Sequence, residues 1–420
     1  MGDFIEFLYS RFLLSDGVSI DTRTIEKDNL FFAISGPNFN ANKFAMEALE
    51  KGAAYAVVDD EQYVTDDRII LAEDGLEALQ ELAKFHRSRF KRPVLGITGS
   101  NGKTTTKELI SRVLSENHIV HATKGNYNNH IGVPLTLLHI HPQVEIAIIE
   151  MGANHVGEIA GYCEVARPTH GLITNIGRAH TETFGGIEGV IRGKSELFDF
   201  IRKNGGTAFI NKNDSVLSNM AKRFESPVVY PPSDFKLLSS SPFLSVQLGT
   251  NEKETNVVGR YNFSNMAAAV AIGRFFEVAD DDILNAIATY EPDNARSQII
   301  KKGTTTIILD AYNANPDSMK VALENLAEQK DSTIAILGDM NEIENANSQH
   351  MEVLTYARKV GIDQVLTVGQ KFGWVADPQF HFKTKEELEQ HLKGSDFKNS
   401  TVLLKASRSV KLETILKSIG

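Results

Sequence analysis

The sequence predicts an α/β protein of three domains whose largely parallel sheets are covered by helices. Short apolar runs, each ending in a Gly- or Asp-containing turn, alternate with helical patterns along most of the chain. Such near-continuous apolar strands are typical of parallel sheets that are buried on both faces. The 420 residues are also more than one domain of about 150 residues accounts for.

The middle of the chain carries four strand–helix units. The strands expected there are PVLGITGS, VEIAIIEMGAN, HGLITNIGRAH and GTAFINKND. They predict a central domain over residues 92–296 with a mostly parallel sheet of the phosphate-loop type. The segment KRP at 91–93 indicates the boundary before it.

A second, smaller series predicts a Rossmann-like domain over residues 297–420. Its strands are TTIILDAYN, STIAILGDM, DQVLTVGQ and TVLLKAS. Helical patterns around 317–329, 348–360 and 384–393 separate these strands. Residues 1–91 form a third, small α/β block, with FFAISG and AAYAVVDD as its expected strands.

Composition narrows the classes of function. The chain has 44 Lys and Arg against 54 Asp and Glu, a formal charge of −10, which disfavours a generic binder of nucleic acid or anionic membrane. No apolar run approaches the roughly 18 residues of a membrane span. Cys163 is the only cysteine, so no intrachain disulfide can form, and its amphipathic setting indicates a core residue and not a nucleophile. We expect a cytoplasmic protein.

A glycine-rich stretch, GITGSNGKTT at 96–105, lies between an expected strand and an expected helix. Gly99 and Gly102 would let the backbone approach a phosphate, Lys103 would supply positive charge, and the Thr104 hydroxyl would bind Mg²⁺. The loop is shorter than the common G-x-x-x-x-G-K-[ST] pattern. A glycine-rich turn with a surface lysine is the alternative, but the flanking strand and helix favour a nucleoside triphosphate site.

Glu150 ends the apolar run VEIAII. Ligands of open α/β sheets lie at the carboxyl ends of strands, so a carboxylate beside the phosphate loop suits Mg²⁺. The alternative is a solvated acid at the end of a strand.

Four further residues are ambiguous from the sequence pattern alone. His180 follows a strand and could contact phosphate, orient another ligand or be a plain loop histidine. Lys194 has the pattern of an exposed helix lysine. Asn262 and Asn265 share a helix face and could read a base edge, although a helix cap explains Asn262 more simply.

Taken together, these segments resemble the Mur ligases, ATP-dependent enzymes that extend the peptide of the cell-wall precursor. The segments TGSNGKTT, EMGAN, NIGRAHTE and GRYNFSNMAAAVA follow the order of the family, and the resemblance spans nearly the whole chain. Its D-alanyl-D-alanine-adding type is indicated by NNHIGVP at 128–134, DAYNANP at 310–316, LGDMNE at 337–342 and LLKASRS at 403–409. The DNPR-type motif of the diamino-acid-adding members is absent.

The resemblance implies an ATP site and up to two metal ions. The residues implied to bind ATP are Gly99, Ser100, Asn101, Gly102, Lys103, Thr104, Thr105, Asn265, Arg296 and Asp310. Those implied to hold Mg²⁺ are Thr104, Glu150, His180 and Lys194, the last as a carbamate formed with CO₂. Lys103, His180, Lys194 and Arg296 are the residues expected to take part in catalysis.

The resemblance also implies the reaction and the roles of the domains. Residues 1–91 would bind the UDP end of UDP-N-acetylmuramoyl-tripeptide, 92–296 would bind ATP, and 297–420 would bind D-alanyl-D-alanine. The implied substrate contacts are Thr22, Arg23, Asn128, Asn129, Asn313 and Asn315. An acyl phosphate would form and then react with the dipeptide amine, in a monomer that has no nucleic-acid partner and no membrane insertion.

Four positions depart from the family pattern. The segment Asn40-Ala41-Asn42 stands where D-G-H is frequent, and Leu309 stands where a second aspartate is frequent. Asn294-Ala295-Arg296 lacks a glycine, and Ala406 replaces one. None of these changes removes a group that phosphoryl transfer needs.

Three other functions are compatible with the sequence. Another Mur ligase or an amide ligase of the folylpolyglutamate synthase kind would share the ATP site, and the amine that it accepts separates it. A nucleotide-gated NTPase would hydrolyse ATP without forming an amide. A non-catalytic binding module has no need to combine Lys103, Glu150 and Lys194. The sequence leaves open the third residue of the tripeptide and the base for the incoming amine.

Overall fold

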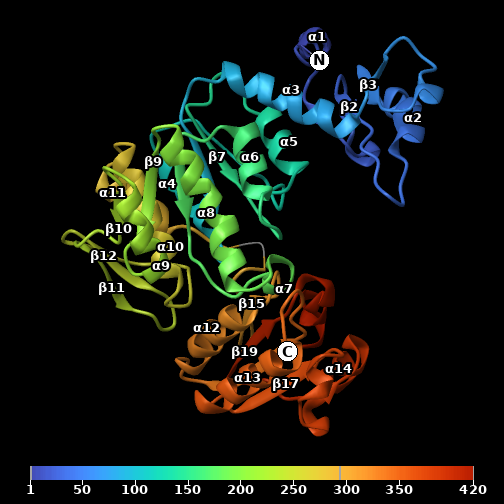
Figure 1. The fold of residues 1–420 in the computed structure, drawn as a ribbon. Coiled ribbons are helices and arrows are strands. Elements are labelled where there is room, and N and C mark those ends of the chain that lie inside the picture. Colours follow the sequence, from blue (N-terminus) through green and yellow to red (C-terminus); the bar gives the residue numbers. More distant parts are fainter. Residues whose placement is uncertain (1, 293–294, 420) are drawn as a thin grey trace.

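The computed structural model describes residues 2–292 and 295–419, which form three α/β units in chain order (Figure 1). The N-terminal, middle and C-terminal units each contain a sheet with helices packed on it. The predicted fold class is therefore confirmed. Within the described residues, none of the helices has both the length and the apolar character that crossing a membrane requires.

The N-terminal unit is a four-stranded parallel sheet in the order β1-β2-β3-β4. Its elements are α1 (Gly2–Phe12), β1 (Val18–Ser19), β2 (Leu30–Phe32), α2 (Ala45–Glu50), β3 (Tyr55–Val58), β4 (Ile69–Leu71) and α3 (Gly75–Arg89). The expected strands FFAISG and AAYAVVDD correspond to β2 and β3. One face of the sheet packs on α2, and the other faces α1 and α3.

The long helix α3 joins the N-terminal unit to the middle unit. Its buried residues Leu79 and Leu82 belong to a core that also contains Val133 and Ile159 of the middle unit. Arg87, near the end of α3, is buried, and its guanidinium donates to the carbonyl oxygens of Ala166 and Arg167, each at 2.7 Å. These carbonyls end α6, so the buried cation also meets the negative end of a helix dipole. The two units therefore share one continuous core, and Figure 1 shows α3 extending from the N-terminal unit to the middle unit.

The middle unit has a six-stranded parallel sheet in the order β10-β9-β8-β5-β7-β6. Its strands are β5 (Val94–Thr98), β6 (Val120–Ala122), β7 (Ile146–Glu150), β8 (His170–Ile173), β9 (Thr207–Asn211) and β10 (Val228–Tyr230). Its helices are α4 (Lys103–Leu114), α5 (Gly132–Leu138), α6 (Glu158–Ala166), α7 (Thr181–Phe184), α8 (Ile187–Lys203), α9 (Ser215–Met220), α10 (Asn262–Phe275) and α11 (Asp280–Ala288). All four predicted strands are present.

The strand order changes direction at β5, which has β7 on one side and β8 on the other. The loops that follow these three strands meet at one edge of the sheet, where a crevice forms in doubly wound folds. A small antiparallel sheet, which the sequence did not predict, follows β10. It consists of β11 (Phe235–Ser239), β12 (Ser245–Leu248) and β13 (Asn251–Glu254).

The C-terminal unit has a six-stranded sheet in the order β14-β15-β19-β16-β17-β18. Its strands are β14 (Gln298–Lys302), β15 (Thr305–Asp310), β16 (Ser332–Gly338), β17 (Gln364–Val368), β18 (His381–Phe382) and β19 (Ser400–Lys405), and its helices are α12 (Pro316–Ala327), α13 (Ala346–Lys359) and α14 (Lys385–Leu392). Only the edge strand β14 is antiparallel to its neighbour. The four predicted strands and three predicted helices are present.

Because Leu79 and Leu323 lie in different cores, their truncation should destabilise different parts of the chain. Each Leu→Ala change should cost about 2–5 kcal/mol. The single tryptophan, Trp374, lies in the C-terminal unit. In urea, Leu79→Ala should shift the transition seen by far-ultraviolet circular dichroism and leave that of Trp374 fluorescence in place. Leu323→Ala should shift the fluorescence transition. Equal shifts of both signals in Leu79→Ala would contradict separate cores.

Candidate active site

A cavity of about 800 Å³ lies where the carboxyl ends of β5, β7 and β8 face the C-terminal unit. The predicted site residues that line it are Ser100, Asn101, Gly102, Lys103, Thr105, Asn128, Asn129, Glu150, His180, Asn265, Arg296, Asp310 and Asn313. Residues separated by more than 200 positions in the chain are thus brought to one place. We call residues 99–105 the phosphate loop and residues 174–180 the β8 loop.

The backbone of the phosphate loop requires both of its glycines. Gly99 and Gly102 have φ values of 150° and 77°. A β-carbon at Gly99 would lie 1.9 Å from the Thr174 hydroxyl oxygen, and one at Gly102 would lie 2.8 Å from the Asn265 amide oxygen. Gly102 also precedes the first turn of α4, whose N–H groups have no acceptor within the helix and can bind an anion.

The β8 loop holds the phosphate loop from one side. The backbone N–H groups of Ser100 and Asn101 donate to the carbonyl and amide oxygens of Asn175, both at 3.0 Å. The Ser100 hydroxyl donates to the carbonyl oxygen of Gly177 at 3.0 Å. These bonds fix the shape of the loop and leave the first turn of α4 for a ligand.

Lys103 is folded back onto its own loop. Its ammonium donates to the carbonyl oxygen of Gly99 at 2.8 Å. Burial is the main cause that lowers the pKa of Lys103 to about 8; the charge of Glu150 opposes this shift, and that of Arg296 contributes to it. A bound phosphate would favour the charged form. Because Lys103 lines the cavity, the alternative of a plain surface lysine is wrong.

Glu150 is buried and is not a solvated acid, so that alternative is also wrong. Its Oε1 accepts from the Thr104 hydroxyl at 3.1 Å and from the Asn128 amide at 2.8 Å. Its Oε2 is buried without a hydrogen-bond partner. A buried carboxylate oxygen without a partner is costly unless a cation meets it. With the Thr104 hydroxyl alongside, the oxygen donors present fit Mg²⁺.

Lys194 lies on α8 with its side chain 1% exposed, so the expectation of an exposed helix lysine is wrong. It makes no hydrogen bond or ion pair with any described residue, and its ammonium lies 5.4 Å from the Phe184 ring centroid. Burial, reinforced by the charge of Lys103, lowers the pKa of Lys194 to about 7. A substantial fraction of Lys194 is therefore an uncharged, nucleophilic amine at neutral pH.

His180 is the N-cap residue that precedes α7, and its backbone is left-handed, with φ 56°. Its Nδ1 lies 2.5 Å from Oε2 of Glu342 in the C-terminal unit. Burial is the main cause that lowers the pKa of His180, while Glu342 opposes this shift. Among the described residues, no group of three or more His, Cys, Asp and Glu side chains could hold a metal by itself. A second metal would need a further oxygen donor.

The two asparagines of α10 form a buried chain of hydrogen bonds. The Asn265 amide donates to Asn262 Oδ1 at 2.8 Å, and the Asn262 amide donates to the Val258 carbonyl oxygen at 2.8 Å. Tyr261, and not Asn262, occupies the N-cap position of α10. The interpretation of Asn262 as a helix cap is therefore wrong, and its side chain instead orients Asn265 beside the phosphate loop.

The C-terminal unit contributes a second group of charges to the cavity. The Arg296 guanidinium lies 3.7 Å from the Tyr312 ring centroid, and its buried Nε has no hydrogen-bond partner. Lys405 pairs with Asp310 at 2.6 Å and donates to the Asn313 carbonyl oxygen at 3.2 Å. The sequence analysis did not select Lys405 or Tyr312. The available signal was a lysine ending the apolar strand β19, directly opposite Asp310 in the sheet register.

Thr104, Gly99 and Asn315 do not line the cavity themselves but bond to or adjoin residues that do. Lys194 does not line it either, and lies instead against the Phe184 ring. Asn315 caps α12, and its amide donates to Asn101 Oδ1 of the phosphate loop at 2.8 Å.

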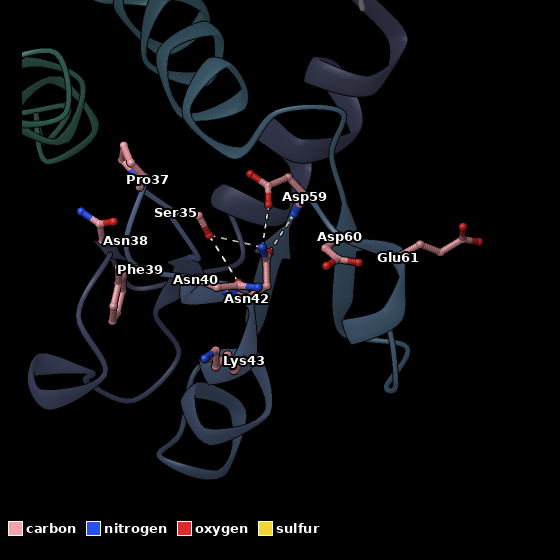
Figure 2. Close-up of a pocket in the computed structure, with 11 residues that line it drawn as sticks. Ser35, Pro37, Asn38, Phe39, Asn40, Asn42, Lys43, Asp59, Asp60 and Glu61 are labelled. Carbon is pink, nitrogen blue, oxygen red and sulfur yellow. Dashed lines mark hydrogen bonds between the residues drawn. The ribbon is translucent and has the colours of Figure 1, made fainter.

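Thr22 and Arg23 lie on the short helix η1 (Thr22–Thr24), and neither lines the cavity. Arg23 instead pairs with Asp21 at 2.6 Å. A second cavity of about 790 Å³ lies in the N-terminal unit, lined by residues 35–40, 42–43 and 59–61 (Figure 2). There the Asn42 amide donates to Asp59 Oδ1 at 2.7 Å, and the Asp59 N–H donates to Asn42 Oδ1 at 3.0 Å.

The four departures from the family pattern lie in different surroundings. Of the segment Asn40-Ala41-Asn42, the two asparagines line the second cavity (Figure 2). Leu309 and Ala406 are buried in the core of the C-terminal unit. Asn294 lies outside the described residues. Cys163 is buried as expected, and burial raises the pKa of its thiol.

Comparison with known proteins connects this cavity to a family. The model of the Mur ligase middle domain matches residues 97–273, and that of the Mur ligase glutamate ligase domain matches residues 295–408. The UDP-N-acetylmuramoyl-tripeptide--D-alanyl-D-alanine ligase of Bacillus subtilis (strain 168) is 33% identical over 424 residues, covering 96% of this chain and 93% of that protein. The enzyme of the same description from Escherichia coli (strain K12) is 32% identical over 424 residues, with coverage of 96% and 93%.

Two solved structures have the same arrangement of units. The crystal structure of MurF from Acinetobacter baumannii has a TM-score of 0.85 and 27% identity, and covers 96% of this chain and 92% of that chain. The MurF ligase of Thermotoga maritima in complex with ADP has a TM-score of 0.84 and 26% identity, and covers 97% of both chains.

The buried amine of Lys194 should make stability depend on pH. Its pKa falls from 10.5 in the unfolded chain to about 7 in the folded one. The unfolded chain therefore binds more protons between these values, and stability rises with pH through that window by at most about 1.4 kcal/mol per pH unit.

Lys194→Met removes this dependence. In metal-free, CO₂-free buffer, the variant should gain most in melting temperature over the natural chain at pH 7 or below, and the gain should shrink toward pH 10. Lys203→Met, on the exposed side of the same helix, is the matched control. A gain that is constant or grows with pH would contradict a buried, neutral amine.

Proposed function

The chain belongs to the Mur ligase family, and from this premise we propose that it joins D-alanyl-D-alanine to UDP-N-acetylmuramoyl-tripeptide with the energy of ATP, in the synthesis of the peptidoglycan precursor. Relatives of that description align with nearly its full length. The observation that carries the proposal is a buried carboxylate with one oxygen free, Glu150, facing the same cavity as Lys103 and Arg296. A cavity built in this way can bring two anions together.

In the first step, the terminal carboxylate of the tripeptide attacks the γ-phosphorus of ATP. A new P–O bond forms, the bond to the ADP oxygen breaks, and an acyl phosphate results. Positioning and charge neutralisation supply most of the catalysis in phosphoryl transfer. Lys103 on the phosphate loop and Arg296 on the C-terminal side place cations on two walls of the cavity for this purpose.

Thr104 and Glu150 are the residues that would hold Mg²⁺. When bound, this ion neutralises phosphate charge and orients the transferred group. The Thr104 hydroxyl already lies 3.1 Å from the Glu150 carboxylate, so both side chains can turn toward one cation.

A second ion would lie between His180 and a carbamylated Lys194. The uncharged amine of Lys194 can add to CO₂, forming an N–C bond and releasing one proton, and the product is an anionic oxygen donor. The buried position and the lowered pKa of Lys194 support this modification. An unmodified lysine offers no such oxygen.

In the second step, the amine of D-alanyl-D-alanine attacks the carbonyl carbon of the acyl phosphate. The C–N bond forms, the amine loses a proton, and the C–O bond to phosphate breaks, so that one carboxylate oxygen leaves with the phosphate. Water would hydrolyse the same intermediate. The C-terminal unit covers the cavity with Tyr312 and Asn313, which limits the access of water.

The remaining assignments follow from this reaction. The N-terminal unit would bind the UDP end of the sugar nucleotide. The second cavity is a better candidate for this role than Arg23, because Arg23 is already paired with Asp21. Asn128 and Asn129 would contact the peptide, and Asn313 the incoming dipeptide. We propose that the enzyme acts as a monomer in the cytoplasm, where its nucleotide substrates are made.

Mass spectrometry of the product tests this function. Incubation with UDP-N-acetylmuramoyl-tripeptide, ATP and Mg²⁺ should give the pentapeptide product only when D-alanyl-D-alanine is added. Single amino acids and L-alanyl-L-alanine serve as control acceptors and should give no product. A product formed only with another amine would indicate a different amide ligase. ATP hydrolysis without any amide would indicate a nucleotide-gated NTPase.

Lys103→Met should abolish most of the ligase activity. Removal of one cation from a developing anionic site costs about 10²–10³ in kcat. Because the methionine keeps the side-chain volume, folding should be preserved, and far-ultraviolet circular dichroism should be unchanged. Lys84→Met, at a half-exposed lysine that pairs with Glu81, is the control and should retain full activity. Wild-type turnover by Lys103→Met would remove Lys103 from the mechanism.

Carbamylation of Lys194 should be visible by spectroscopy, independently of turnover. With ¹³C-labelled bicarbonate, the natural chain should show one protein-bound carbamate carbon in its NMR spectrum. Lys194→Met should lack that signal, and Lys203→Met should keep it. A signal that persists in Lys194→Met would assign the carbamate to another amine.

A further inference from the structure

Arg178 lies in the β8 loop, two residues before His180, and its contacts are not used by the reaction described above. Nearly all of them cross from the middle unit to the C-terminal unit. Figure 1 shows the adjoining helix α7 at the junction of these units.

Asp317 is the main partner of Arg178. The backbone N–H of Arg178 donates to Asp317 Oδ2 at 2.8 Å, and its Nε and Nη2 donate to Oδ1 at 2.9 and 2.6 Å. Three donors of one residue thus converge on one carboxylate, which is the strong, directional form of an ion pair. The fit is close, because a β-carbon at Gly177 would lie 3.1 Å from Asp317 Oδ2.

Glu352 on α13 is the second carboxylate. Arg178 Nη1 donates to its Oε2 at 3.1 Å, and Lys320 of α12 pairs with the same carboxylate. Gln349 lies at 3.3 Å from Nη1. One side chain of the middle unit therefore holds both α12 and α13.

The first turn of α12 also reaches the phosphate loop. Asn315, its N-cap residue, donates to Asn101 Oδ1, while Asp317, two residues later, is held by Arg178. The β8 loop itself is bonded to the phosphate loop through Ser100 and Asn101. The phosphate loop, the β8 loop and the start of α12 thus form one closed set of contacts.

We propose that Arg178 is a positioning residue that couples docking of the C-terminal unit to the shape of the phosphate loop. Its ion pairs exist only while the middle and C-terminal units are in contact. In the same contact, its backbone N–H donates to Asp317 and so fixes the β8 loop. Each pair is about one-third exposed, so each alone contributes little. Because both carboxylates bind the same guanidinium, the pairs form a network. Loss of this network lowers the fraction of molecules in which the C-terminal unit is docked. The kinetic part of this inference rests on the proposed function, and the docking part does not.

Arg178→Ala tests the coupling, with Arg274→Ala as the matched control. Arg274 is equally exposed and also pairs with two carboxylates, Asp234 and Asp280, but within the middle unit. Docking is measured by single-molecule energy transfer between dyes on Lys222→Cys and Lys393→Cys, because native Cys163 is buried and will not label. The chain is saturated with ADP and Mg²⁺.

Arg178→Ala should lower both kcat and the ratio of docked to undocked molecules by about tenfold, the factor for losing a network of charged hydrogen bonds. Arg178→Lys, which keeps the charge but not the fork of donors, should lie between Arg178→Ala and the natural chain. Glu352→Gln should lower docking in the natural chain and have less effect in Arg178→Ala, because the pair is already lost. Arg274→Ala should change neither docking nor kcat.

An unchanged docked population in both Arg178 variants would overturn the proposal. A fall in melting temperature without a change in docking would likewise assign Arg178 a merely structural role. If the natural chain forms no amide product, the proposed function fails, but the energy-transfer measurement still decides the role of Arg178.

Discussion

The contact between the phosphate loop and the β8 loop is the interaction on which the rest of the site depends. It uses the backbone N–H groups of Ser100 and Asn101 for internal bonds and leaves the first turn of α4 to face the cavity. The same β8 loop carries His180 and Arg178, which reach Glu342 and Asp317 in the C-terminal unit. Because Gly99 permits this close approach, the binding of nucleotide and the placement of the C-terminal unit share one structural element.

Charge is the second constraint, because both main substrates of the proposed reaction are anions and the chain carries a formal charge of −10. The structure satisfies this constraint by placing positive charge locally, because Lys103, Lys405 and Arg296 all line one cavity. Burial makes a cation expensive, as the lowered pKa of Lys103 shows. It also strengthens the attraction to a bound phosphate, since less water screens the charge. Net charge therefore describes the surface of this protein and not its active site.

Much of the fold could be predicted from the sequence, because apolar strands between glycine-containing turns identify a parallel sheet wherever they occur. The phosphate loop could be predicted equally well, because the pattern that identifies it lies within ten consecutive residues, 96–105. Contacts such as Arg178 with Glu352 could not be predicted, because no local pattern places residues 174 positions apart side by side. The residue pattern alone placed Lys194 on an exposed helix face, and this interpretation was wrong for a related reason. Its helix is amphipathic, and only the packing of Phe184 and α6 decides that this lysine faces inward. The small sheet β11–β13 was missed because its edge strand, NEKE, is fully polar and exposed.

The central claim is that this cavity activates a carboxylate by phosphorylation before an amide forms. The most direct measurement follows oxygen atoms from UDP-N-acetylmuramoyl-tripeptide labelled with ¹⁸O in its terminal carboxylate. With ATP, Mg²⁺ and D-alanyl-D-alanine, mass spectrometry should find one ¹⁸O atom in the inorganic phosphate for each pentapeptide formed, and one in the new amide. Phosphate that contains only unlabelled oxygen would contradict the account, because the γ-phosphoryl group would then have passed to water and not to the substrate.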